Sequence, residues 1–326
     1  MNELPRRLRV VIPILCLLGI ALAAGGCGSS GKAETREAPA ASTFPSAEGK
    51  TIDQVLEDSG AVPAEDVVVS PAAETFTVGV NRYPFGVFAL SGRQVDDADV
   101  ALYFAKSANS AVEGPLPAKV ISLETKPAYR AQGSAGDVKT AYVVPEVDFD
   151  RSGPWLAIAM LKGPAGLEAT RLPSPTVGLH PGIPQVGEKA PVVHTPTPDD
   201  VGGDLAKIDT RVPPDQMHAD FADVVGRKPV ILLFATPALC QSRVCGPVVD
   251  IAQQVADEYE GEVEFIHMEI YENNEPPNVR PQLQAYGLET EPWLFAIDEN
   301  GVVRERIEGA FGVAELEEAV HSVLPG

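Results

Sequence analysis

Two cysteines near residue 240 are the residues best suited to carry chemistry. Cys240 and Cys245 are separated by four residues, between the apolar run Val230–Phe234 and a stretch headed by Pro247. A thiolate that attacks a disulfide needs a second thiol nearby to release the product, so a close pair can perform thiol–disulfide exchange. Such a pair can also form a structural disulfide or hold a soft ion such as Cu(I). The residue types alone leave these three interpretations open.

The elements that must position this pair alternate between strands and helices. Val230–Phe234 is continuously apolar, which is typical of a buried parallel strand. The spacing of apolar residues predicts helices over 247–260, 278–286 and 313–323, with strands over 263–270, 293–297 and 302–307. Asn300-Gly301 predicts a hairpin between the last two strands. This order predicts an α/β region with a parallel pair, an antiparallel hairpin and helices on both faces of the sheet.

This order resembles the thioredoxin family, and two motifs carry the resemblance. One is the cysteine pair before a helix that begins near Pro247, and the other is the stretch Tyr286–Trp293, which is similar to the family's cis-proline loop. The resemblance implies a thioredoxin-like domain over 192–326 and thiol–disulfide exchange with exported thiol or disulfide proteins, without a cofactor. It also implies that Cys240 attacks, that Cys245 resolves the mixed disulfide, and that Pro292 lies beside the sulfurs.

The sequence departs from the family pattern at several positions. The family places two residues between its cysteines, whereas four stand here. Counting back from the helix makes Cys245 the second cysteine, but a literal reading of Cys245-Gly246-Pro247-Val248 makes it the first and Val248 a lost partner. Leu233 stands where many members keep a buried acid. Glu291 precedes the cis-proline position, where its charge would raise the pKa of a thiol.

Copper-delivery proteins with related folds add a histidine from a later loop to their two thiolates. The corresponding metal set here would be Cys240, Cys245 and His267. His267 falls on a predicted strand, where a hydrogen-bonded structural histidine is the competing interpretation. We expect no resident metal.

The N-terminus reads as a targeting segment. Arginines at positions 6, 7 and 9 precede the apolar run Val10–Ala24, and Cys27 follows a pair of glycines. The ending resembles the lipobox of bacterial lipoproteins, which implies a signal peptide over 1–26 and lipidation of Cys27. The chain would then be anchored on the extracytoplasmic face of the cell membrane, with 27–64 as a flexible tether. Ordinary signal cleavage would instead leave Cys27 as a free thiol.

Short strands between turn residues predict an all-β domain over 65–173. In 99–105, the residues Val100, Leu102 and Phe104 alternate with smaller or polar-tipped ones, as in a half-buried strand. The pattern favours an antiparallel sandwich that loosely resembles immunoglobulin-like domains, followed by a Pro/Gly-rich linker over 174–191. We therefore expect a multidomain chain. If the cysteines only form a disulfide, its alternative function is that of a non-catalytic surface or binding lipoprotein.

The charge of the chain excludes one class of partner. Its 326 residues carry a formal net charge of −21. Nucleic-acid affinity is built from Lys and Arg contacts to phosphate, so no nucleic-acid partner is expected.

Overall fold

The computed structural model describes residues 35–324, apart from 134–135, 137 and 164–165. These described residues belong to one compact unit. The predicted signal peptide 1–26 and Cys27 lie outside them. Among the described residues, no helix combines the length and apolarity needed to span a bilayer.

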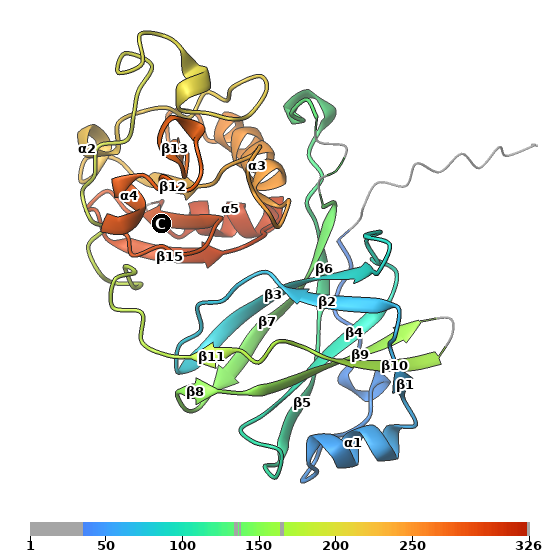
Figure 1. The fold of residues 1–326 in the computed structure, drawn as a ribbon. Coiled ribbons are helices and arrows are strands. Elements are labelled where there is room, and N and C mark those ends of the chain that lie inside the picture. The colour runs from blue at the N-terminus through green and yellow to red at the C-terminus, as the bar shows by residue number, and fades with distance from the viewer. Residues whose placement is uncertain (1–34, 134–135, 137, 164–165, 325–326) are drawn as a thin grey trace, which may run out of the picture. The chain divides into compact units, whose positions relative to one another are not determined.

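The N-terminal half contains two antiparallel sheets and a small strand pair (Figure 1). One sheet has the order β2-β3-β7-β6, formed by Val67–Pro71, Gly79–Ala89, Thr140–Phe149 and Lys119–Ser122. The other has the order β1-β10-β9-β4-β5, formed by Val62–Pro63, Gly166–Arg171, Leu156–Gly163, Asp99–Ala105 and Val112–Pro117, in which only β1 runs parallel to its neighbour. The small pair joins β8 (Gly153–Pro154) and β11 (Thr176–Val177).

Aromatic side chains from both sheets fill one apolar core. Tyr83 and Phe85 of β3 and Phe104 of β4 are fully buried in it, and Trp155 packs against Phe149 with ring centroids 5.0 Å apart. The shared core agrees with two packed sheets, and Trp155 is core, as large aromatics usually are. The immunoglobulin-like topology stays a prediction.

The segment predicted as a flexible tether differs from that prediction over its described part. Helix α1 (Ile52–Ser59) is capped by Thr51, whose side chain accepts from the Gln54 amide. Val55 is buried against Tyr103, on the opposite face of β4 from the sandwich core. Strand β4 is therefore buried on both faces instead of one, because residues assigned to the tether cover its outer face.

The C-terminal half has one four-stranded sheet of order β13-β12-β14-β15. Its strands are Glu264–Met268, Val230–Phe234, Trp293–Ile297 and Val303–Glu308. β12 and β13 are parallel, and the other two pairs are antiparallel. The helices are α2 (Phe221–Val224), α3 (Cys245–Glu258), α4 (Pro281–Ala285) and α5 (Val313–His321), and short 3-10 turns occupy 41–43, 127–129, 205–207 and 272–274. These directions match the predicted parallel pair and the predicted antiparallel hairpin of an α/β region.

Helices cover both faces of this sheet, as predicted. Residues of α3 and α5 pack with Ile231 and Leu233 on one face. Phe221 of α2 and Leu283 of α4 pack with Phe234 on the other. Leu233 is thus part of an apolar core.

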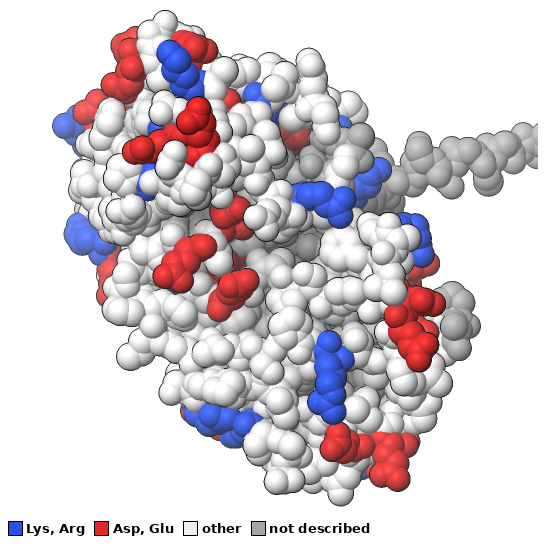
Figure 2. Space-filling model, viewed as in Figure 1, with Lys and Arg blue, Asp and Glu red and all other residues white. Residues whose placement is uncertain are grey.

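The two halves share part of their cores. Ile121, Leu123 and Val143 from the all-β half lie in the same buried cluster as Val249 of α3 and Phe311. The predicted linker is also packed, since Ile183 is buried with the C-terminal core. On the face seen in Figure 2, acidic side chains form several small groups, with Lys and Arg between them.

Candidate functional site

The register of the sheet brings the cysteine loop and the proline loop to one edge. Phe234, the last residue of β12, pairs with Trp293, the first residue of β14, in antiparallel register. The chain that leaves β12 toward Cys240 therefore starts beside the chain that enters β14 from Pro292. The Glu291–Pro292 peptide bond is cis, as the motif predicted.

Cys240 is half-buried in the loop between β12 and α3. Its amide donates to the Thr236 carbonyl at 3.1 Å, and its Sγ lies 3.2 Å from the Ser242 hydroxyl. Hydrogen bonds from the Cys245 thiol, the Ser242 hydroxyl and nearby backbone amides stabilise the thiolate and, against the opposing effect of burial, lower the pKa of Cys240 to about 6. Cys240 is thus suited to be a thiolate at neutral pH.

Cys245 is the first residue of α3 and is fully buried. Burial raises its pKa well above the ordinary value, and the hydrogen bond that it gives to Cys240 acts in the same direction. Both cysteines are free thiols in this structure. Val248, the alternative partner in the literal reading of the motif, packs in the apolar core and offers no reactive group.

Two further ionisable side chains lie near the sulfurs. The pKa of Glu291 is raised by burial and by the negative charge of Cys240. The pKa of Tyr271 is raised by burial and then by the charges of Glu291, Cys240 and Cys245. The charges of Glu291 and the two thiols therefore influence one another, at the position where the sequence predicted an anion that raises the pKa of a thiol.

The all-β half supports the cysteine loop through the connection between β6 and β7. The Val138 amide donates to the Arg243 carbonyl at 3.3 Å, and Arg243 Nη1 donates to the Gly136 carbonyl at 3.1 Å. On α3, Asp250 Oδ2 accepts from the Ala131 amide at 2.9 Å. Sequence reasoning missed this support, since nothing local to 123–138 indicates what it packs against.

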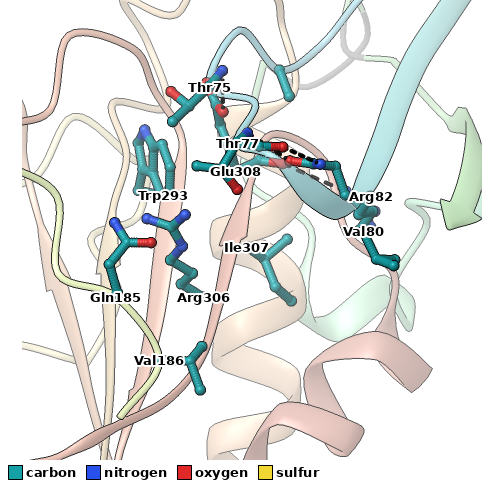
Figure 3. A pocket seen from close by; sticks show the side chains of 12 residues that line it. Thr75, Thr77, Val80, Arg82, Gln185, Val186, Trp293, Arg306, Ile307 and Glu308 are labelled. Carbon is teal, nitrogen blue, oxygen red and sulfur yellow. Dashed lines mark hydrogen bonds between the residues drawn. The ribbon is translucent and has the colours of Figure 1, made fainter. Parts of the chain in front are cut away.

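A different segment of the all-β half supports the proline loop. Glu308 on β15 accepts from the amides of Glu74 and Thr75 and from the Thr290 hydroxyl, at 2.7 to 3.0 Å. The Thr290 oxygen in turn accepts from Trp293 Nε1 at 2.9 Å. A pocket of about 380 Å³ opens beside these groups, with Arg306 and Gln185 on its wall (Figure 3).

His267 does not join the cysteines in a metal site. Its Nδ1 donates to Asp215 Oδ2 at 2.6 Å and its Nε2 donates to the Ala235 carbonyl at 3.1 Å. Both nitrogens carry protons in this arrangement. Burial lowers the pKa of His267, but the charge and hydrogen bond of Asp215, with the charges of Asp209 and Glu269, raise it to about 10. An imidazolium cannot ligate copper, so the set Cys240, Cys245 and His267 is not supported.

A buried polar cluster behind the site was missed from the sequence. Asp209, Asp215 and His218 come together on the segment that precedes α2, next to His267. The signal was present as two acids and a histidine within ten residues. It was not recognised because the stretch has no helical or strand periodicity to place these side chains together.

No protein-family model and no curated protein matches this chain. A solved chain from Chlorobium tepidum, named as a thiol:disulfide interchange protein DsbE, is similar at 18% identity, over 44% of this chain and 99% of that one, with a TM-score of 0.31. This similarity is too weak to assign a role to any residue of this chain. Residue roles are based on the contacts within the chain itself.

Proposed function

We propose that the chain is a thiol–disulfide exchange protein, anchored through lipidated Cys27 on the extracytoplasmic face of the cell membrane, that acts on exported proteins. One observation carries the proposal. A half-buried thiol with a pKa of about 6 lies hydrogen-bonded to a fully buried thiol with a raised pKa at the start of α3. This asymmetry is what an attacking and a resolving thiol require.

The reaction would proceed in two exchanges. The Cys240 thiolate attacks one sulfur of a substrate disulfide, the substrate S–S bond breaks, and the other substrate sulfur leaves as a thiolate that takes up a proton. Cys245 then loses its proton and attacks Cys240 Sγ, which releases the second substrate thiol. The substrate disulfide is reduced, Cys240 and Cys245 are oxidised to a disulfide, and a dithiol reductant must restore them.

Glu291 is the proton acceptor that we propose for the second exchange. Cys245 must be deprotonated despite its raised pKa, and Leu233 offers no carboxylate. The charge of Glu291 raises the pKa of Cys245, and burial raises the pKa of Glu291 above its ordinary value. A carboxylate in that environment is a better base than an exposed one.

The test is the reduction potential together with a trapped intermediate. We expect a potential less negative than about −300 mV, within the range of roughly −270 to −120 mV that redox-active pairs show. Cys245→Ser should accumulate mixed disulfides with a disulfide-bonded substrate, because the resolving thiol is missing. The double variant Cys240→Ser/Cys245→Ser is the control and should trap nothing.

The opposite result is equally definite. A potential well below about −300 mV, no disulfide-reductase activity and no mixed disulfide with Cys245→Ser would identify the pair as a structural disulfide. The chain would then be a surface or binding lipoprotein.

A further inference from the structure

A second cluster of chemically capable side chains lies behind the cysteine loop. Asp209, Asp215 and His218 are all buried, with the His218 side chain only 5% exposed and both carboxylates fully buried. His218 Nε2 lies 3.4 Å from Asp209 Oδ2 and 3.5 Å from Asp215 Oδ1. One ligand atom from each residue lies within 4.8 Å of the other two.

The imidazole of His218 is the part of this cluster that the protein leaves unsatisfied. Neither ring nitrogen makes a hydrogen bond with the described residues, although Nε2 points between two carboxylates. Burial of a polar group without a hydrogen-bond partner is unfavourable. His267, by contrast, has partners for both of its nitrogens. A buried imidazole nitrogen that lies close to two carboxylate oxygens but makes no hydrogen bond with them has the geometry of a ligand set for a cation.

The spacing suits a tetrahedral metal ion. With metal–ligand bonds of about 2.0–2.1 Å, neighbouring ligand atoms of a tetrahedral site are separated by roughly 3.4 Å. The distances from His218 Nε2 to the two carboxylate oxygens are 3.4 and 3.5 Å. An imidazole among the ligands favours zinc and its neighbours over magnesium or calcium, which prefer all-oxygen sites.

The carboxylates are also held as metal ligands usually are. Asp215 Oδ1 accepts from the Met217 amide at 2.8 Å, and Asp209 Oδ2 accepts from the Asp215 amide at 2.7 Å. The second oxygen of Asp215 is held by His267. Such outer partners orient the ligands and fix the direction of their lone pairs.

We propose that Asp209, Asp215 and His218 bind a divalent ion of the zinc class. The bound ion would stabilise the segment that contacts the start of the cysteine loop. The link to that loop is direct: Thr210, next to Asp209, accepts from the Ala238 amide at 3.0 Å, and His267 donates to the Ala235 carbonyl. The ion would hold the segment 209–218 in place, and that segment in turn holds the start of the loop. This site is separate from the thiols and does not depend on their redox role.

The test uses zinc itself as the probe, in a background that removes the thiols. The full chain with Cys240→Ser/Cys245→Ser, dialysed against a chelator, is titrated with Zn²⁺ by calorimetry and with Co²⁺ by visible absorption. We expect one equivalent to bind, with the visible bands of tetrahedral Co²⁺ and a rise in melting temperature. His218→Asn in that background should lower the zinc affinity by about 100-fold or more.

A matched control is available elsewhere on the chain. His194 also lies between two aspartates, 2.7 Å from Asp220 and 3.4 Å from Asp200, but its side chain is 55% exposed. His194→Asn should leave zinc binding unchanged. Should His218→Asn fail to fold, the titration of the thiol-free chain still decides the matter. Absence of stoichiometric zinc binding there, or equal loss with both histidine variants, would overturn the proposal.

Discussion

At the residue scale, Cys240 and Cys245 differ in pKa because the surroundings of Cys240 stabilise a thiolate and those of Cys245 do not. Cys240 receives hydrogen bonds from a thiol, a hydroxyl and backbone amides, whereas Cys245 is enclosed by apolar groups. The sequence predicted which two residues form the pair. It left their order open, because four intervening residues have no fixed conformation until the loop is seen against α3 and the support behind it.

The charge of Glu291 gives a direct test of this electrostatic balance. The alkylation rate of Cys240 should rise with pH around a midpoint near 6, since only the thiolate reacts. Glu291→Gln removes a nearby negative charge that disfavours the thiolate, so it should move the midpoint to lower pH. The measurement is the iodoacetamide rate of Cys240 from pH 4 to 9 in the reduced chain that keeps Cys245, because the Cys245 thiol helps to set this midpoint.

Glu289 provides the control for that shift. It lies two residues away on the same loop and is exposed. Glu289→Gln should leave the midpoint where it is. A midpoint that moves upward in Glu291→Gln, or not at all, contradicts the assigned influence of this carboxylate on the thiol.

At the scale of elements, the strands were the most predictable part of the fold. Val230–Phe234 and Trp293–Ile297 have the bounds that their apolar runs indicated. Helix α3 begins at Cys245, two residues before the predicted start, because the prediction took Pro247 as the first helical residue, whereas it lies within the first turn. Helix α1 was missed altogether, because a short amphipathic helix in an Ala/Ser/Pro-rich stretch resembles a tether. Its apolar side packs on Tyr103, and the sequence does not show this contact.

The turn between β15 and α5 depends on one glycine. Gly309 has φ of +81°, and a Cβ there would lie 2.2 Å from the Ala72 carbonyl oxygen. Gly309→Ala should therefore lower the free energy of unfolding by roughly 2–4 kcal/mol, from backbone strain and steric clash together. Urea unfolding measures this loss.

Gly163 is the matched position for this comparison. A Cβ there would meet no atom within 4 Å, and its φ lies outside the left-handed region. Gly163→Ala should change the free energy of unfolding by less than about 0.5 kcal/mol. Equal effects of the two substitutions would show that the close approach of Ala72 to Gly309 does not stabilise the molecule.

At the scale of the whole molecule, an ion pair joins the two halves. Arg82 of β3 donates through Nε and Nη2 to both oxygens of Glu315 on α5, at 3.2 and 2.9 Å, and Lys119 lies 3.3 Å from the same carboxylate. Burial opposes ionisation of Glu315, but the charge and hydrogen bonds of Arg82, together with the charge of Lys119, outweigh burial and lower the pKa of Glu315. No local pattern in the sequence could have paired residues 233 positions apart.

This ion pair predicts a pH-dependent stability. Because the folded pKa of Glu315 is lowered, its contribution is fully present above the unfolded value of about 4.3 and disappears as pH falls through the folded pKa. Arg82→Ala should cost roughly 1–3 kcal/mol at pH 7, allowing for partial exposure of the pair, and less at pH 3. Urea unfolding at both pH values measures the difference.

An exposed ion pair serves as the comparison. Arg171 and Asp53 lie 3.3 Å apart with side chains 62% and 77% exposed. Arg171→Ala should change stability by less than about 1 kcal/mol at either pH. If the cost of Arg82→Ala grows on acidification, the assigned sign of the Glu315 contribution is wrong.

The core that the two halves share has a consequence for how such a chain can change over time. Ile121, Leu123 and Val143 fill space against α3 and the α5 region, so each half supplies part of the other's interior. A recombination event that exchanged one half for a distant counterpart would leave cavities or clashes at this surface. The two halves are therefore expected to diverge as a single heritable unit, with changes on one side selected for their fit to the other.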